Sequence, residues 1–468
     1  MDQSASSQPW PDKPAQDVPG QRLRARGGQR ALVAILSVGL AAYVALFLDT
    51  VARSFIRAPY GDGFDILAVE FAAQDRHDPA AYLWLPHNGH HIVWLRLLTS
   101  LDVRLFHGQS IVFVLPTLAA VLAAAALIAR QIWRGVEDKA LASVLATIAP
   151  LALLTTLNAF DVSVSINIPY VYAATFAVAA FLVVENAATG IGTVFALLAL
   201  AAGAGMGNSV GLAAVPVLMI AVLRRPDRGR LTLFWVLGPI LMAVFVLTAG
   251  KMSVQAGGQG TAPGAVEQAG RMLRYFLDFC GLPWSATSDR MALPGGLQLA
   301  AQVAGLLIGL LLSVLGLFLA ARPARGTGAR DRLDRFCCSL ILFSLAAAAM
   351  AVVGRIRATA GMELPVRYSV LLAPLHIGVL VLLAIRSPSL GRASPRTLST
   401  AVSIVLALGL AHQLAGRYVI VRYCGRINHI LAEYDAGRRT PEMTQYVYPD
   451  LRRAEQVSAE MRRRGVYQ

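Results

Sequence analysis

The chain has 468 residues, of which 56% are hydrophobic and 15% are charged, with a formal net charge of +15 at pH 7. Soluble domains carry about 25% charged residues, so this composition excludes an ordinary soluble enzyme and indicates an integral membrane protein. The basic excess would indicate nucleic-acid binding in a soluble protein, but in a membrane protein topology explains it, and we expect no nucleic-acid partner.

Apolar runs recur along most of the chain. A polar leader, residues 1–30, precedes the first run, which is too long for the core of a cleaved signal peptide. Residues 31–415 predict an all-α polytopic membrane domain with about eleven transmembrane helices. These lie near residues 31–48, 111–129, 140–156, 170–185, 190–205, 209–223, 231–249, 298–320, 336–353, 369–385 and 397–415. The runs 190–205 and 209–223 are short and interrupted by glycines, so we expect a broken or re-entrant pair there.

The short loops predict the orientation. With the leader in the cytoplasm, the leader and the short inner loops hold 20 of the 42 basic residues. The positive-inside rule therefore places three longer segments outside, namely residues 50–110, 250–297 and, less directly, the tail 416–468. A cytoplasmic tail with an even number of spans is the alternative. We expect a multi-pass membrane protein with its polar chemistry on the outer side.

The first outer loop, residues 50–110, carries the richest chemistry. Residues 64–73 have helical periodicity, which predicts a helix on the membrane surface. Asp62 and Asp65 are three residues apart, so they share one face of that helix. A partly desolvated carboxylate is suited to remove a proton from an acceptor hydroxyl. The alternative is an N-cap at Asp62 and a solvated acid at Asp65, and we expect Glu70 and Asp75 to be solvated.

The same loop holds three closely spaced histidines. Pro86 at a first helical turn would place His87, His90 and His91 on one helical face, beside Trp94. Such a face could contact a phosphate or a sugar, bind a divalent metal, or serve interfacial packing, and the residues alone leave these alternatives open. Asn88 belongs to the same stretch. Arg96 either contacts substrate or pairs with Asp102.

Arginines also occur at the outer end of a later apolar run. Arg355, Arg357 and Arg367, with Tyr368, follow the run 336–353, where the positive-inside rule would not place them. Their guanidinium groups are suited to bind a lipid phosphate, and pairing with Glu363 or with first-loop acids is the alternative. Residues 271–279 predict an amphipathic surface helix. In the tail, Pro449 and Asp450 predict a helix start, and the residues before Gly465 predict its end.

On these motifs the chain resembles the GT-C superfamily of polyprenyl-phosphate-sugar-dependent membrane glycosyltransferases. The likeness is strongest to a bacterial group with a His-Asn-x-His first-loop motif, here His87-Asn88-Gly89-His90. Weaker matches lie at Asn158…Asn167, Gly207-Asn208…Pro216, Gly354-Arg355…Arg367-Tyr368 and Tyr448-Pro449-Asp450. The resemblance implies that Asp62 is the catalytic acid of the first loop, with Asp65 as the second acid. Many relatives have adjacent acids, whereas here two residues separate them.

The resemblance implies an inverting transferase with a polyprenyl-phosphate sugar donor and a lipid-linked or envelope glycan as acceptor. Membrane lipids are its other expected partners, and no cofactor is required beyond a possible divalent metal. Two other classes use similar topologies: a transporter or flippase of lipid-linked sugars, and a glycan polymerase or ligase. A transporter would show internal repeats and charges deep inside spans, and neither is present. A polymerase usually concentrates its chemistry in later outer loops.

Overall fold

The structure is a computed structural model that describes residues 19–56, 59–249, 265–282, 295–355, 366–387 and 395–466. These residues fold almost entirely into helices and contain no β-strand. The principal helices are α1 (Pro19–Arg53), α2 (Gly63–Asp75), α3 (Pro79–Trp84), α4 (Val93–Leu105), α5 (Ile111–Gly135), α6 (Lys139–Leu153), α7 (Ala159–Ser163), α8 (Ile168–Asn186), α9 (Ile191–Gly207), α10 (Ala214–Arg224), α11 (Phe234–Thr248), α12 (Ala265–Cys280), α13 (Gly295–Ala320), α14 (Ala329–Arg355), α15 (Ser369–Arg386), α16 (Pro395–Asp435), α17 (Met443–Tyr446) and α18 (Leu451–Arg463).

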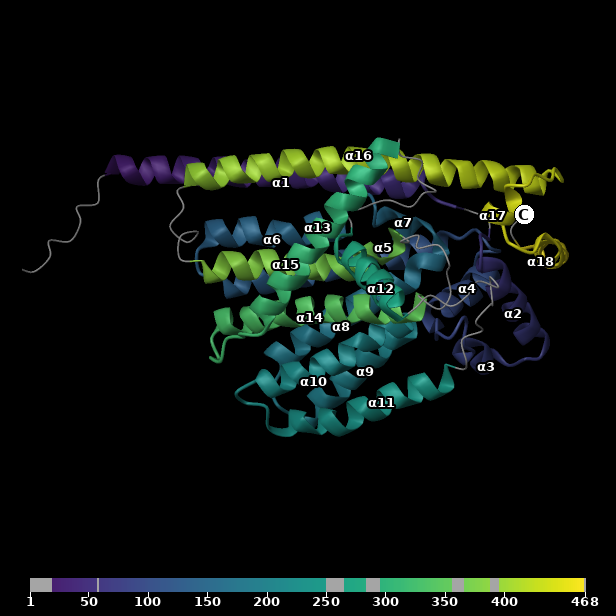
Figure 1. The fold of residues 1–468 in the computed structure, drawn as a ribbon, viewed down its shortest axis with the longest axis horizontal. Coiled ribbons are helices and arrows are strands. Elements are labelled where there is room, and N and C mark those ends of the chain that lie inside the picture. Colours follow the sequence, from purple (N-terminus) through teal and green to yellow (C-terminus); the bar gives the residue numbers. More distant parts are fainter. Residues whose placement is uncertain are drawn as a thin grey trace, which may run out of the picture.

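Within the described residues, eight helices are long and apolar enough to cross a membrane. They coincide with eight of the eleven expected runs, so the prediction of an all-α polytopic membrane protein is confirmed. The other three runs, 140–156, 190–205 and 209–223, fold as shorter apolar helices, α6, α9 and α10. Figure 1 shows the helices running roughly parallel, with α1 and α16 side by side along one edge of the bundle.

The expected break between α9 and α10 is present at Asn208. Asn208 is extended, with φ −160° and ψ 151°, and a short 3-10 helix, η2 (Ser209–Ala213), turns the chain into α10. A side chain at Gly207 would collide with the backbone of Pro169 and Ala173 in α8. Glycine at this position therefore permits the close approach of α9 to α8. Helices α9 and α10 form a helical hairpin with its turn at Asn208.

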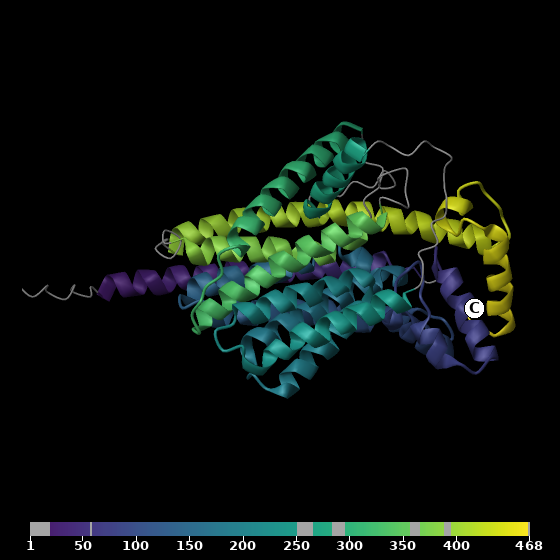
Figure 2. The same ribbon diagram turned by 60° about the horizontal axis from the view of Figure 1, so that its bottom comes forward.

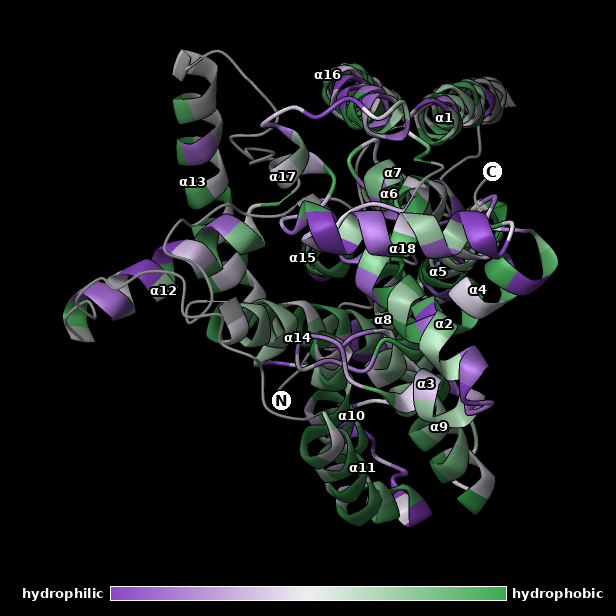
Figure 3. Ribbon diagram, turned by 90° about the vertical axis from the view of Figure 1, so that its right-hand side faces the viewer, coloured by the Kyte–Doolittle hydropathy of each residue, from purple (hydrophilic) through white to green (hydrophobic). Residues whose placement is uncertain are grey.

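The first loop and the tail lie together at one end of the bundle (Figures 1 and 3). As predicted, a helix, α2, covers residues 64–73, and a second helix, α18, begins at Asp450, whose carboxylate caps the backbone N–H groups of Arg452 and Arg453. Arg464, just after α18, donates to Asp75 at 2.6 Å and lies over the ring of Phe71. The tail is thereby packed against α2. Figure 3 shows the hydrophilic stripe of α18 in front of the apolar bundle.

Two features extend the predicted layout. Helix α16 continues without interruption past residue 416 to Asp435, so the expected boundary between the membrane domain and the tail falls inside one helix. Helix α12 covers the amphipathic segment 271–279 as expected, and with α13 it projects from one side of the bundle, while Phe279 and Leu319 pack in the main core (Figure 2). Residues 250–264 and 283–294 of the second long loop lie outside the described residues.

Candidate functional site

A cavity of about 460 Å³ lies where the first loop, the tail and the ends of the membrane helices meet. Its walls come from α2, the histidine-containing loop, the start of α8, the α9–α10 turn, the end of α14, the segment before α15 and the tail. Its lining includes Asp62, Asp65, His87, Asn88, His90, Tyr170, Asn208, Gly354, Arg367, Tyr368, Tyr448 and Asp450. Motifs that are up to several hundred residues apart in sequence therefore share one cavity.

Asp62 stands at the N-cap position of α2 but does not cap the helix with its side chain. Its Oδ2 lies 3.3 Å from Nε2 of His87 and 3.4 Å from Nδ2 of Asn88. The preceding Gly61 has a φ of +52°, which favours glycine, and its backbone N–H donates to the carbonyl of Val447 in the tail. The carboxylate is thus directed into the cavity, where an imidazole and an amide lie beside it.

Asp65 lies one turn further along α2 and faces the same cavity. Its Oδ2 accepts a hydrogen bond of 2.5 Å from the hydroxyl of Tyr448, and its Oδ1 lies 3.9 Å from Nε of Arg453. Both partners belong to the tail. The two acids thus share a face, as their spacing predicted, but Asp62 is contacted by the histidine loop and Asp65 by the tail.

The three histidines do not lie on a helix, so that prediction is wrong. His87 and His90 exchange two backbone hydrogen bonds, of 2.8 and 2.9 Å, and the residues between them, Asn88 and Gly89, have φ values of +49° and +74°. This is a tight turn of the type that Asn-Gly favours, because both residues tolerate positive φ. The Asn-Gly pair was the signal in the sequence, and it outweighs the helical spacing.

The turn separates the three imidazoles. His87 contacts Asp62, and Nδ1 of His90 lies 2.9 Å from Oγ of Ser209 at the α9–α10 turn. His91 points elsewhere, between the carbonyl of Trp84 at 2.8 Å and Oγ1 of Thr248 at 2.9 Å. Burial lowers the pKa of His91, and the nearby positive charge of Arg96 lowers it further. Among the described residues, no group of three His, Cys, Asp or Glu side chains is arranged to hold a metal ion.

Arg367 supplies the positive charge of the cavity. It belongs to a 3-10 turn, η5 (Val366–Tyr368), just before α15. Its guanidinium lies 5.9 Å from the ring centre of Tyr170 and 5.8 Å from that of Tyr368, and its charge interacts with the Asp62 carboxylate. The Nε of Arg367 is buried without a hydrogen-bond partner among the described residues. A guanidinium that lines a cavity is suited to bind an anionic group.

The other predicted arginines are placed differently. Arg96 is only 1% exposed, donates to the carbonyl of Tyr82 at 2.5 Å and stacks on the Tyr82 ring, so it joins α3 to α4 and does not line the cavity. Asp102, its expected alternative partner, accepts a hydrogen bond from the backbone N–H of Ser110. Arg355 is the last residue of α14, next to the cavity-lining Gly354. Arg357 lies outside the described residues.

Two acids are fully buried, Glu70 against expectation. Glu70, expected in solvent, is fully buried and accepts hydrogen bonds from Gln74 at 2.8 Å and Ser100 at 2.7 Å. It stabilises the packing of α2 on α4. Asp161 in α7 is fully buried, and its carboxylate oxygens have no hydrogen-bond partner among the described residues. Burial raises the pKa of Asp161 well above its usual range, and the positive charge of Arg367 opposes this shift.

Tyr170 and Ser209 were not singled out from the sequence. Tyr170 stands in an apolar helix, α8, where one more aromatic residue carries no functional signal. Ser209 contacts the histidine loop only because the chain reverses at Asn208. Comparison of the chain with protein-family models, curated proteins and solved structures finds no match to any of them.

Proposed function

We propose that this chain is an integral-membrane glycosyltransferase of the GT-C type. It transfers a sugar from a polyprenyl-phosphate donor to a lipid-linked or envelope glycan at the outer face of a bacterial inner membrane. One observation carries the proposal: two carboxylates, Asp62 and Asp65, and the guanidinium of Arg367 line a single cavity at the end of the membrane helices. A base and an anion-binding group in one pocket are what transfer from a sugar phosphate requires.

Asp62 is the better candidate for the base. Its side chain is 43% exposed and lines the cavity, so an acceptor hydroxyl can approach it. Asp65 is already engaged by the Tyr448 hydroxyl at 2.5 Å, and its role is to orient the acceptor or Asp62. In the reaction, the acceptor oxygen bonds to the anomeric carbon while the bond to the phosphate oxygen breaks. Asp62 takes the acceptor proton, and the lipid phosphate leaves.

Arg367 would bind the donor phosphate. Arg367 lines the same cavity as Asp62, and its guanidinium lies 5.9 Å from the ring centre of Tyr170 and 5.8 Å from that of Tyr368. A fixed guanidinium stabilises the negative charge that grows on the leaving phosphate. The neighbouring wall, Met350 and Ala351 near the end of α14, is apolar and suits the first isoprene units of a lipid donor.

The test is a transfer assay with the full chain in proteoliposomes and a radiolabelled polyprenyl-phosphate sugar, using envelope glycolipid as acceptor. We expect Asp62→Asn to lower the initial rate by about 10²-fold to 10⁴-fold, the range typical of a lost general base. Asp65→Asn should have a smaller effect. The matched control is Asp78→Asn, because Asp78 caps α3 outside the cavity and Asn caps helices equally well.

Full transfer by both the Asp62→Asn and Asp65→Asn variants would contradict the assignment. Movement of the labelled donor across the bilayer without a new glycosidic bond would contradict the enzyme itself and indicate a transporter.

A further inference from the structure

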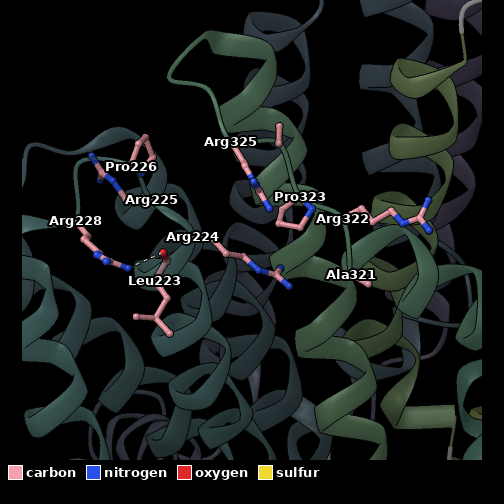
Figure 4. A pocket seen from close by; sticks show the side chains of 10 residues that line it. Leu223, Arg224, Arg225, Pro226, Arg228, Ala321, Arg322, Pro323 and Arg325 are labelled. Carbon is pink, nitrogen blue, oxygen red and sulfur yellow. Dashed lines mark hydrogen bonds between the residues drawn. The ribbon is translucent and has the colours of Figure 1, made fainter.

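A second cavity, of about 770 Å³, lies between the α10–α11 loop and the α13–α14 loop (Figure 4). None of its lining residues is acidic, and half of them are arginines. The five arginines are Arg224, Arg225, Arg228, Arg322 and Arg325. Arg224 is the last residue of α10, Arg225 and Arg228 follow it in the α10–α11 loop, and Arg322 and Arg325 lie in the α13–α14 loop (Figure 4).

This basic cavity lies at the opposite end of the bundle from the candidate active site. The α9–α10 hairpin has its turn, Asn208, in the active-site cavity, whereas Arg224 at the far end of α10 lines the basic cavity. Helix α14 starts near the basic cavity at Ala329 and reaches the active-site cavity with Gly354. The two cavities thus belong to opposite faces of the membrane.

Two of the five arginines have structural partners. Arg225 is buried, donates to both carboxylate oxygens of Asp227 at 2.9 and 2.6 Å, and also donates to the carbonyl of Ala187. Arg224 donates to the carbonyl of Ala320 at 2.9 Å, which ties the end of α10 to the end of α13. These contacts stabilise the walls of the cavity and give the positive charges of Arg224 and Arg225 a structural role.

The other three keep most of their donors unused. Arg228 makes one hydrogen bond, of 3.3 Å, to the carbonyl of Leu223. The guanidinium of Arg322 lies over the ring of Phe318, and within the described ranges the side chains of Arg322 and Arg325 make no hydrogen bond or ion pair. Three positive charges without a carboxylate partner repel one another, and an anion bound between them would relieve that repulsion.

The surroundings indicate that the anion carries acyl chains. Leu223 in the cavity wall is 45% exposed, and Phe318, beneath Arg322, is 56% exposed. Each stands on a different apolar helix, α10 and α13, on the membrane side of the arginines. A soluble anion would gain nothing from these two side chains, whereas the chains of a phospholipid would cover them.

We propose that this cavity binds the phosphate headgroup of an anionic membrane phospholipid, in the leaflet opposite the candidate active site. Basic pockets between transmembrane helices have this chemistry, and the planar guanidinium binds phosphate oxygens in pairs. The inference does not depend on the proposed transferase activity. The competing explanation is that these arginines only set the orientation of the chain, a role that needs positive charge in a loop and no shared cavity.

The test measures lipid retained by the purified full chain with native mass spectrometry. The probes are phosphatidylglycerol, phosphatidylcholine with the same acyl chains, and inorganic phosphate. We expect preferential retention of phosphatidylglycerol, and a loss of about fivefold in affinity for each arginine removed in Arg322→Gln and Arg325→Gln. The matched control is the Arg130→Gln, Arg134→Gln double variant. It removes two exposed charges from the last turns of α5, where Gly135 contacts Leu333 at the same end of the bundle.

A further variant separates binding from topology. The Arg322→Lys, Arg325→Lys chain keeps the charges that orient the protein but lacks the guanidinium fork, and we expect it to fold normally with weakened retention of phosphatidylglycerol. Equal retention of both phospholipids by the natural chain would overturn the proposal. The proposal would also be overturned if the control double variant lost as much affinity for phosphatidylglycerol as the variant with Arg322→Gln and Arg325→Gln. Displacement of the lipid by inorganic phosphate at equal concentration would show a site for a soluble anion and overturn the assignment to lipid.

Discussion

The hydroxyl of Tyr448 donates a hydrogen bond of 2.5 Å to Oδ2 of Asp65, across 383 residues of sequence. Burial raises the pKa of Tyr448 above its usual range, and the bond to Asp65 raises it further. The C-terminal tail is thereby part of the wall of the active-site cavity. This contact joins the tail to the first loop beside the Arg464–Asp75 pair and a shared hydrophobic cluster.

The Tyr448→Phe variant tests that relationship. We expect it to lower the free energy of unfolding by about 1 kcal/mol, because a partly exposed hydrogen bond to a carboxylate is lost. Transfer should also slow, because Asp65 is held less firmly. Melting temperature in detergent and the initial transfer rate measure the two effects. Tyr418→Phe is the control, since Tyr418 is an exposed phenol on α16 outside the cavity. Equal behaviour of the two variants would show that the Tyr448 contact has no role.

The Asn-Gly turn offers a pair of variants that separate folding from chemistry. Asn88→Gly keeps a residue that accepts the φ of +49° but removes the amide that reaches Asp62, so we expect normal stability and slower transfer. Gly89→Val forces a branched side chain into a φ of +74° and should cost about 1–2 kcal/mol of stability as well. Thermal unfolding and transfer assays distinguish them. Normal transfer by Asn88→Gly would remove Asn88 from the site.

Arg367 should affect donor binding more than acceptor binding. We expect Arg367→Gln to raise the KM for the polyprenyl-phosphate donor and to lower kcat, by about 10²-fold in kcat/KM, because the leaving phosphate loses its counter-charge. The kcat/KM of the Arg367→Lys variant should fall between those of the natural chain and Arg367→Gln, since lysine keeps the charge but not the planar fork. The control is Arg426→Gln, which removes an exposed arginine paired with Glu442 outside the cavity. A change in acceptor KM alone would place Arg367 on the acceptor side.

His91 predicts how the stability of the fold depends on pH. Its pKa is lowered below the ordinary 6.5 by burial, so the folded state favours the neutral imidazole. The unfolded chain therefore binds a proton more readily, and stability from this residue is complete above pH of about 6.5 and declines as the pH falls below it. We expect the natural chain to lose more melting temperature between pH 7.5 and 5.5 than His91→Gln does. A larger loss of melting temperature in His91→Gln than in the natural chain would contradict the lowered pKa of His91.

Much of the fold could be predicted because membrane helices need long apolar runs, and such runs are visible without tertiary information. All eleven expected runs fold as helices, and α18 begins directly after its predicted cap residue, Asp450. The histidine face was predicted wrongly because helical spacing was preferred to the Asn-Gly turn signal. The exposure of Glu70 was predicted wrongly for a different reason, because its burial beside Ser100 depends on how α2 packs on α4.

The sequence by itself determined the class of the protein, the helical runs and the sites where polar chemistry gathers, because each follows from local composition and period. Only the tertiary structure decided which polar residues meet. It placed Asp62, Asn88, Arg367 and Tyr448 around one cavity. Arg96 and His91 instead contact carbonyl groups of α3, those of Tyr82 and Trp84. The physical reason is that proximity across hundreds of residues depends on helix packing and on chain reversals such as the one at Asn208, which no local pattern encodes.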